Sequence, residues 1–461
     1  MTAINQLHFF NHASFAIERD SEILLIDPWY EGTAFHNGWA LLDVSTCDAS
    51  IIEWLKQSDK KIFIWYSHEH SDHLSMSFLK SISKEKIDLT VIFQKTLDGR
   101  VSAFLNKLGL NVIDANEGST VSLGERFDIT TWPYHGGDSF CLIRSKDISL
   151  LNINDCVIST EDQAQTVKSK CSTLVPNLDI LLTQFGYANW IGNESDRDQR
   201  IKLANHKFDR IFIQNKILSP TFIIPFASFV YFCHKENFYL NDAQNSPNDV
   251  LMAKQLESIK NNIFFLKPRD NISLDGIKSI RSQLENFSGQ AIKHWGHLKE
   301  IIKPLQTKPK EVESRELKDT YLNYRKRMTL NFIFLPQVFE AIKLIKPIRI
   351  FITDIDKVAN LSYLNGITFK ENSNDWHISL SSEVFSFIFR NEFGFNTTHV
   401  NGRFRLGKEK RIFDVAKFFV IQDFYKQGFG ISHPTKSANF FIRKVIRFLT
   451  RRLLKSNQQP L

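Results

Sequence analysis

Four residues that can bind metal lie within one six-residue segment, His68-Glu-His70-Ser-Asp72-His73. Imidazole and carboxylate groups are ligands for zinc, iron and manganese, and a mixture of the two can hold two adjacent ions. Such a segment could instead be an ordinary polar loop, but it directly follows the apolar run 61–66, where burying uncompensated charge is costly. We therefore predict a metal centre with one or two ions, taking zinc first and iron or manganese as alternatives.

Two residues further along the chain are candidates to complete the ligand set. His135 follows a strand-like run and precedes two glycines, which let the backbone come close to a metal. Asp155 ends the strand-like run 149–155, where a carboxylate can bridge two cations. The alternative for His135 is an ordinary turn histidine, and the alternative for Asp155 is a turn cap. Asp72 and Asp155 are also the candidate catalytic residues, because either carboxylate could accept a proton during the reaction.

The elements that must position these residues alternate between strands and helices. Strand-like apolar runs occur at 8–17, 22–26, 61–66, 89–94, 111–114, 127–133, 139–144, 148–153, 178–182, 210–214 and 221–224. Helix-like stretches lie near 74–83, 98–108, 160–171 and 194–207. This alternation predicts a layered α/β domain over residues 1–270. His12 and Asp27 fall near the ends of its first strands, and Asp27 is expected to support a ligand rather than to bind metal.

The pattern changes after residue 270. Residues 271–315 are polar and helix-like and end in a Lys/Pro/Glu-rich stretch, which predicts a helical linker. Residues 316–436 combine helix-like and strand-like runs, which predicts a smaller α+β domain. Residues 437–461 form a basic tail with helical periodicity.

The segment after Asp423, which includes the basic tail, accounts for the net charge of +8, because it contains eight Lys and Arg residues and no Asp or Glu. An amphipathic cationic helix can lie on an anionic membrane surface, although its apolar face could instead dock on the second domain. The remainder of the chain is neutral, so nucleic acid is not an expected partner. Five scattered Cys residues and the lack of a signal-peptide pattern predict a cytoplasmic protein, with peripheral contact at the inner face of the membrane as a further hypothesis.

Together these motifs resemble the metallo-β-lactamase superfamily from His8 to about Asp270. The matching stretches are N-H-A-S at 11–14, I-D-P-W at 26–29, S-H-E-H-S-D-H-L at 67–74, the turn at His135, and L-N-I-N-D-C at 151–156. The resemblance implies a four-layer αββα sandwich. Within the superfamily the sequence looks most similar to the metallo-β-lactamase-like part of CMP-N-acetylneuraminate monooxygenase, through residues 27–42, 225–229 and 266–269. It also resembles the phospholipase-D-like and sugar-lactonase branches.

The resemblance implies a specific distribution of ligands. His68, His70 and His135 would hold one ion, Asp72 and His73 would hold a second, and Asp155 would bridge the two ions. This sequence departs from the family's pattern in the last ligand. The phospholipase-like branch places its last histidine ligand at the end of the final core strand, where this sequence reads Ile-Ile-Pro-Phe at 223–226. The nearest histidine is His234, which is either a ligand or an ordinary pocket or surface residue.

A second departure concerns electron supply. The monooxygenase family carries a Rieske iron–sulfur domain, and the C-x-H…C-x-x-H ligand pattern of such a cluster does not occur in this sequence. A reaction of that kind would therefore need a separate Rieske partner.

Three functions are compatible with these features. The first is a metal-dependent hydrolase that acts on a phosphodiester, ester or lactone, with a small sugar- or lipid-linked molecule such as a sugar nucleotide or a phospholipid as substrate. The second is the metal-containing component of a nucleotide-sugar oxygenase. The third is a metal-containing binding protein without catalytic activity.

Overall fold

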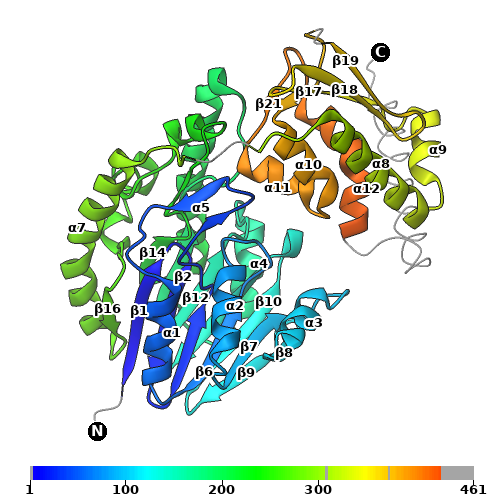
Figure 1. The fold of residues 1–461 in the computed structure, drawn as a ribbon. Coiled ribbons are helices and arrows are strands. Elements are labelled where there is room, and N and C mark those ends of the chain that lie inside the picture. The colour runs from blue at the N-terminus through cyan, green and yellow to red at the C-terminus, as the bar shows by residue number, and fades with distance from the viewer. Residues whose placement is uncertain (1–3, 307–309, 372–373, 427–461) are drawn as a thin grey trace, which may run out of the picture. The chain divides into compact units, whose positions relative to one another are not determined.

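The computed structural model describes residues 4–306, 310–371 and 374–426 (Figure 1). The chain divides into two units, Met1–Gln306 and Thr307–Leu461. The predicted basic tail, residues 437–461, lies outside the described residues. Within the described part, no helix is long and apolar enough to cross a membrane.

A seven-stranded sheet forms one half of the first unit. Its strands, in spatial order, are β16 (Asn271–Ser273), β1 (Asn5–Asn11), β2 (Ser14–Arg19), β3 (Glu22–Ile26), β6 (Lys61–Tyr66), β7 (Leu89–Gln94) and β8 (Asn111–Ala115). The strands from β3 to β8 run parallel, whereas β16, β1, β2 and β3 pair in antiparallel fashion. Five of the six residues of β6 are buried, as expected for a strand covered on both faces.

A six-stranded sheet forms the other half. Its order is β14 (Phe222–Phe226), β13 (Ile180–Gln184), β12 (Ile148–Asn154), β11 (Ser139–Ser145), β10 (Phe127–Pro133) and β9 (Thr120–Gly124). A small third sheet contains β15 (Val230–Phe232), β5 (Trp39–Leu41) and β4 (Thr33–Ala34).

Side chains of the two large sheets share one apolar core, so the sheets face each other. Phe15, Leu24 and Trp65 from the first sheet lie in the same cluster as Ile143 and Leu182 from the second. The outer face of the first sheet packs against α1 (Asp48–Gln57), α2 (Met76–Lys84) and α3 (Arg100–Lys107). The outer face of the second sheet packs against α4 (Glu161–Cys171) and the end of α5 (Arg197–Leu218). The predicted four-layer αββα sandwich is therefore confirmed (Figure 1).

The predicted strand at 210–214 is wrong, because these residues lie inside α5. The buried residues Ala204, Phe208, Ile211 and Leu218 recur at helical spacing and pack one side of this 22-residue helix on the core. The prediction rests on the short apolar run Ile-Phe-Ile at 211–213, and an apolar run of that length does not distinguish a strand from a buried helix.

The first unit extends further than the predicted boundary at residue 270. Helix α7 (Ile277–Ile301) falls within the segment 271–315 that was interpreted as a linker. Its buried residues Ile280, Leu284 and Trp295 belong to the core between the sheets, and the Trp295 indole donates a hydrogen bond to the Leu266 carbonyl at 2.7 Å. Most polar residues of α7 lie on its outer side, so composition alone predicts a linker for a helix that in fact packs on the core. The short helix α6 (Pro247–Met252) precedes it.

The second unit has the α+β organisation expected for it. Its sheet has the order β19 (Gly366–Glu371), β18 (Lys357–Ser362), β17 (Ile348–Ile352), β20 (Ile378–Leu380) and β21 (Arg405–Leu406). Its helices are α8 (Ser314–Asn331), α9 (Leu335–Ala341), α10 (Ser382–Arg390), α11 (Gly394–Asn401) and α12 (Ile412–Lys426). Buried aromatic residues fill its core, including Tyr324, Tyr363 and Phe418.

Candidate metal centre

The histidine-rich segment forms the turn between β6 and α2. The backbone amides of His73 and Leu74 both donate to the His70 carbonyl, at 3.0 and 2.8 Å, which closes a tight turn before α2. This turn buries His68, Asp72 and His73, whereas the His70 side chain is exposed. His68 Nε2 and His70 Nδ1 lie 2.9 Å apart. The cluster therefore has one side that reaches solvent.

Five of the predicted ligands come together at this turn. His68, His70 and Asp72 form one group whose ligand atoms lie within 4.8 Å of one another, and His68, His73 and Asp155 form another. Asp155 follows β12 of the second sheet, and its Oδ2 lies 3.6 Å from His73 Nε2 and 4.0 Å from His68 Nε2. The two sheets thus bring their ligands to the same place.

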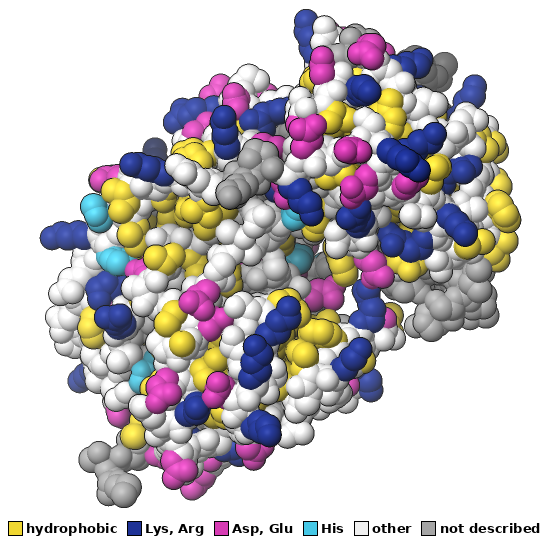
Figure 2. Space-filling view, viewed as in Figure 1, with side chains coloured by type: hydrophobic (Ala, Val, Ile, Leu, Met, Phe, Trp, Pro, Cys, Tyr) yellow, Lys and Arg dark blue, Asp and Glu magenta, His cyan; other side chains and the backbone are white. Residues whose placement is uncertain are grey.

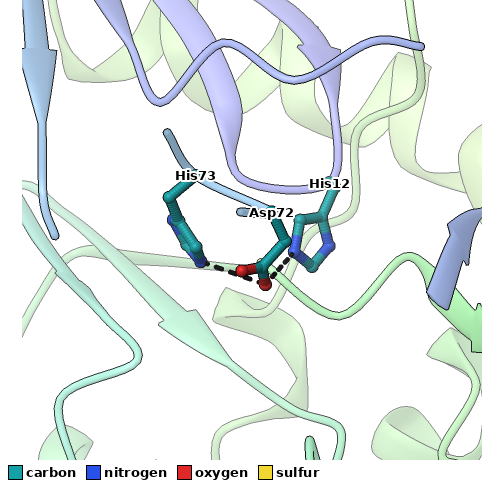
Figure 3. Close-up of side chains that lie close together, drawn as sticks. All are labelled: His12, Asp72 and His73. Carbon is teal, nitrogen blue, oxygen red and sulfur yellow. Dashed lines mark ion pairs between the residues drawn. The ribbon is translucent and has the colours of Figure 1, made fainter. Parts of the chain in front are cut away.

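His12 joins the same cluster through a third group, with Asp72 and His73. Asp72 Oδ2 lies 3.6 Å from His12 Nε2 and 3.5 Å from His73 Nε2. Figure 3 shows the two imidazole rings directing a nitrogen at the Asp72 carboxylate from opposite sides. The sequence placed His12 near a strand end but did not show this contact, because the turn between β1 and β2 is distant from the turn after β6 in the chain.

Several buried polar atoms of the cluster have no hydrogen-bond partner in the described structure. They are both ring nitrogens of His12, Nε2 of His73 and Oδ1 of Asp72. A buried polar group without a partner is costly, and most such groups in proteins are satisfied. Imidazole nitrogens and carboxylate oxygens in one small volume are also the donor set that zinc, iron and manganese use. The residues present therefore fit a metal ion.

Asp27 fixes the orientation of His73. Its carboxylate accepts hydrogen bonds from the Ser67 amide and hydroxyl, at 2.8 and 2.7 Å, and from the Asn154 side-chain amide at 2.7 Å. Asp27 Oδ2 also lies 3.0 Å from His73 Nδ1, which leaves Nε2 turned towards Asp72 and Asp155. A carboxylate that holds the second nitrogen of a histidine is a common support for metal ligands. Asp27 thus has the supporting position expected for it.

The cluster sets the charge of its own members. Burial would raise the pKa of Asp155, but the charge and hydrogen bond of His73 and the charge of His68 lower it to about 2. The pKa of Asp72 is also held well below its usual range, because His73 and His12 outweigh burial. Burial and the neighbouring His73 and His70 lower the pKa of His68. At neutral pH these carboxylates are ionised, which is the form that binds metal. The pKa of His73 is raised well above its usual range, because Asp72, Asp27 and Asp155 outweigh burial, so His73 must release its proton when it binds an ion.

Residues outside any motif also contact the cluster. Gln184 donates to Asp155 Oδ1 at 3.0 Å and accepts a hydrogen bond from the buried ammonium of Lys207, whose pKa burial lowers to about 7. Burial and the charges of Asp155 and Asp72 raise the pKa of Asp138 to about 7, so the charges of the cluster also act on this further carboxyl group. Sequence reasoning missed these residues because each has a position in a strand, helix or turn that is typical of structural residues.

The structure does not bring His135 or His234 into any of the three groups. His135 is exposed in a 3-10 turn, His135–Gly137, with its ring 5.1 Å from that of Tyr134. His234 follows β15, and its Nδ1 lies 3.1 Å from a carboxylate oxygen of Glu236. Their roles as ligands stay predictions. Two surface cavities, of about 590 and 370 Å³, share no lining residue with the cluster.

The four-layer sandwich and the H-x-H-x-D-H turn at the end of a central strand give this chain the metallo-β-lactamase fold. In sequence, the chain is similar to cytidine monophosphate-N-acetylneuraminic acid hydroxylases. It is 25% identical over 290 residues to that of Xenopus laevis, covering 59% of this chain and 46% of the relative. It is 26% identical over 283 residues to that of Cricetulus griseus, covering 59% and 48%. The chain thus spans about half the length of the curated relatives it matches.

Among solved structures, similarity is found to CmlA, a diiron β-hydroxylase from Streptomyces venezuelae, with a TM-score of 0.40 and 13% identity over 59% of this chain and 55% of that one. The metallo-β-lactamase fold protein YhfI from Bacillus subtilis has a TM-score of 0.40 and 12% identity, covering 58% of this chain and 98% of that one. No family model matches the chain.

Proposed function

We propose that this chain is a metal-dependent hydrolase whose reaction takes place at the cluster of His68, His70, Asp72, His73 and Asp155. The observation that carries the proposal is the convergence of imidazole and carboxylate ligand atoms within 4.8 Å of one another, among which His73 Nε2 and Asp72 Oδ1 are buried without hydrogen-bond partners in the described structure. These five residues would hold the ion or ions, with zinc, iron or manganese compatible with the donor set. A bound ion would lower the pKa of a water molecule to about 7 and stabilise charge that develops on the substrate.

The chain's own residues have separate tasks in this proposal. Asp72 and Asp155 are ionised at neutral pH, so either can accept the proton released when water attacks. The exposed His70 and the partly exposed Asp155 mark the side from which a substrate reaches the cluster. Cys156 is next to Asp155 in the chain, but burial raises the pKa of its thiol well above the usual range. That thiol is therefore protonated at neutral pH and is not the nucleophile.

The proposed substrate is a small phosphodiester, ester or lactone, with a sugar nucleotide or a phospholipid as the candidate class. A second candidate function is supported by the similarity to hydroxylases of a nucleotide sugar. In that case the chain is the metal-containing component of an oxygenase, and a separate Rieske protein supplies the electrons. The third candidate function is that of a metal-containing binding protein that does not turn over a substrate.

Activity assays with defined metals test the proposal. Metal-free protein is reloaded with zinc, manganese or iron and assayed on bis(p-nitrophenyl) phosphate, p-nitrophenyl acetate and an aliphatic lactone. The same preparations are assayed on CMP-N-acetylneuraminate with dioxygen and a chemical reductant. We expect hydrolysis with zinc or manganese, and its loss in Asp155→Ala.

Oxygen consumption that requires iron and the sugar nucleotide would replace the hydrolase proposal with the oxygenase. Substrate binding without any turnover, in fully metal-loaded protein, would contradict both and leave the binding protein.

A further inference from the structure

We infer that His12 is a ligand of a second metal ion, in the place that the final core strand leaves without a histidine. The inference rests on the proposed function and adds a residue to its site. The strand β14 ends in Pro225 and Phe226, neither of which can bind metal through its side chain. His234, the nearest histidine in sequence, contacts Glu236 instead.

The distances around His12 match those between two ligands of one ion. Ligand atoms about 2.0–2.2 Å from a tetrahedral ion lie about 3.3–3.6 Å from each other. His12 Nε2 is 3.6 Å from Asp72 Oδ2, and His73 Nε2 is 3.5 Å from the same oxygen. Direct hydrogen bonds would bring these pairs closer, to about 2.7–3.2 Å. Each imidazole nitrogen therefore lies at the distance from Asp72 Oδ2 that two ligands of one ion would have, rather than at the distance of a hydrogen-bond partner.

The backbone and the neighbouring rings hold His12 in this position. Its amide donates to the Asn11 side chain at 2.9 Å, and its carbonyl accepts from the Ala227 amide at 2.8 Å. The Trp29 ring stands edge-on to the imidazole with centroids 5.8 Å apart. His12 is only 2% exposed, and neither ring nitrogen has a hydrogen-bond partner. An imidazole that is buried with both nitrogens unpaired is costly unless something binds it.

Metal stoichiometry tests the inference. Full-length protein, His12→Ala and His12→Gln are saturated with zinc and analysed by mass spectrometry of the metal, and cobalt-loaded samples give absorption spectra. We expect two ions per chain in the unaltered protein, one in both variants, and a changed cobalt spectrum. His234→Ala is the matched control and should keep two ions.

Circular dichroism of the metal-free variants shows whether they are folded. Two ions in His12→Ala would overturn the inference, as would a single ion in the unaltered protein. A complete lack of bound metal in the unaltered protein would instead overturn the proposed function.

A different observation concerns the second unit: we propose that the corner formed by α8 and α9 binds anionic lipid surfaces. Six large apolar side chains are exposed within fifteen residues there. They are Leu330 (55%), Ile333 (70%), Phe334 (60%), Val338 (48%), Ile342 (60%) and Leu344 (51%). Figure 2 shows hydrophobic side chains along the right-hand edge, where α9 lies in Figure 1. We call these six residues the α9 patch. Contiguous exposed apolar side chains commonly mark a binding surface.

The backbone keeps the most prominent side chains of the patch outside. Ile333 and Phe334 link α8 to α9 with φ angles of 49° and 60°. A left-handed conformation is unusual for any residue with a side chain and is an outlier for a β-branched one. Such local strain persists only where the surrounding structure imposes it, and it is often found at binding sites.

The charge around the α9 patch indicates the partner. Residues 325–347 contain five Lys and Arg residues, of which Lys326, Lys343 and Lys346 are exposed. Glu340 is the only acidic residue in this range, and it is buried and accepts a hydrogen bond from the Tyr363 amide at 2.6 Å. Exposed apolar side chains with exposed lysines close to them in the sequence complement a lipid surface with anionic headgroups. The segment 427–461 has seven Lys and Arg residues and no Asp or Glu, so like charges disfavour it as the occupant.

Vesicle co-sedimentation of the full chain tests this second proposal. Vesicles of phosphatidylcholine alone are compared with vesicles that contain about 30% phosphatidylglycerol, to which lysines near the surface are attracted. We expect binding to the anionic vesicles, reduced roughly tenfold or more in the double variant Ile333→Ser, Phe334→Ser. Leu97→Ser, Met252→Ser is the matched control, because these residues are 89% and 82% exposed in the first unit.

Equal binding by the α9-patch variant and the unaltered chain would overturn the proposal, as would no binding by the unaltered chain. Self-association that the α9-patch variant abolishes, without vesicle binding, would overturn it in favour of a second copy of the chain.

Discussion

A cluster of buried ionisable side chains in the first unit contrasts with a patch of exposed apolar side chains in the second. The first unit buries ionisable groups, with His68, Asp72 and His73 each no more than 2% exposed. The second exposes apolar groups, with Ile333 and Phe334 at least 60% exposed. Buried polar groups and exposed apolar patches are both informative because folding alone disfavours them. Under our two proposals, the partner that completes each site differs in kind: a cation for the first unit and a lipid surface for the second.

Removing the metal should have the largest effect and should distinguish the two units. An ion present at 1,000 times its dissociation constant stabilises the folded state by about 4 kcal/mol. We expect chelation with 1,10-phenanthroline to lower the melting temperature of the first unit by several degrees in differential scanning calorimetry. The transition of the second unit, which has no such cluster among its described residues, serves as the internal control. Equal changes in the melting temperatures of both units, or no change in either, would contradict a metal site that belongs to the first unit alone.

Asp27→Ala should destabilise the first unit even without metal. The change leaves the Ser67, His73 and Asn154 donors without their shared acceptor, and breaking such a buried network costs about 3–5 kcal/mol. Urea unfolding of the metal-free protein measures the effect. Asp27→Asn keeps the volume and one acceptor oxygen and should lose less. If both variants have the same free energy of unfolding as the unaltered protein, Asp27 does not hold the cluster.

Gln184→Ala should weaken metal binding without removing a ligand. Gln184 donates to Asp155 Oδ1, and loss of a supporting hydrogen bond to a metal ligand costs about 10- to 100-fold in affinity. A competition titration with a zinc chelator measures the dissociation constant. Gln214→Ala is the matched control, since Gln214 is buried and contacts Thr183 rather than Asp155. Similar affinities for the two variants would show that Gln184 does not position Asp155.

The smallest expected effect is that of Ile333→Ser on stability. An exposed side chain makes few contacts, so the free energy of unfolding should change by about 0.5 kcal/mol or less. The same change at Ile350, which is fully buried in β17, should cost about 3 kcal/mol or more. Urea unfolding compares the pair. A large loss in Ile333→Ser would mean that the residue supports the second unit rather than a partner.

Local sequence features predicted much of the cluster. The turn from His68 to His73 follows a buried strand directly. One short segment of sequence therefore shows both where the strand ends and how the ligands are spaced after it. Asp155 was found in the same way, at the end of β12. The contacts of His12 and Gln184 join segments far apart in the chain, and one sequence does not report them. The prediction for His135 rests on the two glycines that follow it. Glycines indicate a tight backbone turn, but they do not determine where the neighbouring side chain points.

The fold was predicted where hydrophobic periodicity is long and regular. The alternating strands and helices of the first unit led to the layered sandwich. The apolar run inside α5 was too short to separate strand from helix. The polar outer side of α7 concealed the residues with which it packs on the core, and the exposed side chains of the α9 patch could not be recognised without the structure. In each case the deciding information is a tertiary contact, or the lack of one.

Metal analysis of the purified full-length protein tests the central claim most directly. The unaltered chain, His68→Ala and Asp155→Ala are measured together, with circular dichroism to show that each is folded. The account predicts at least one zinc, iron or manganese ion per chain in the unaltered protein and clearly less in both variants. Unchanged metal content in both folded variants would contradict the site, and so would an unaltered chain that binds none of these metals.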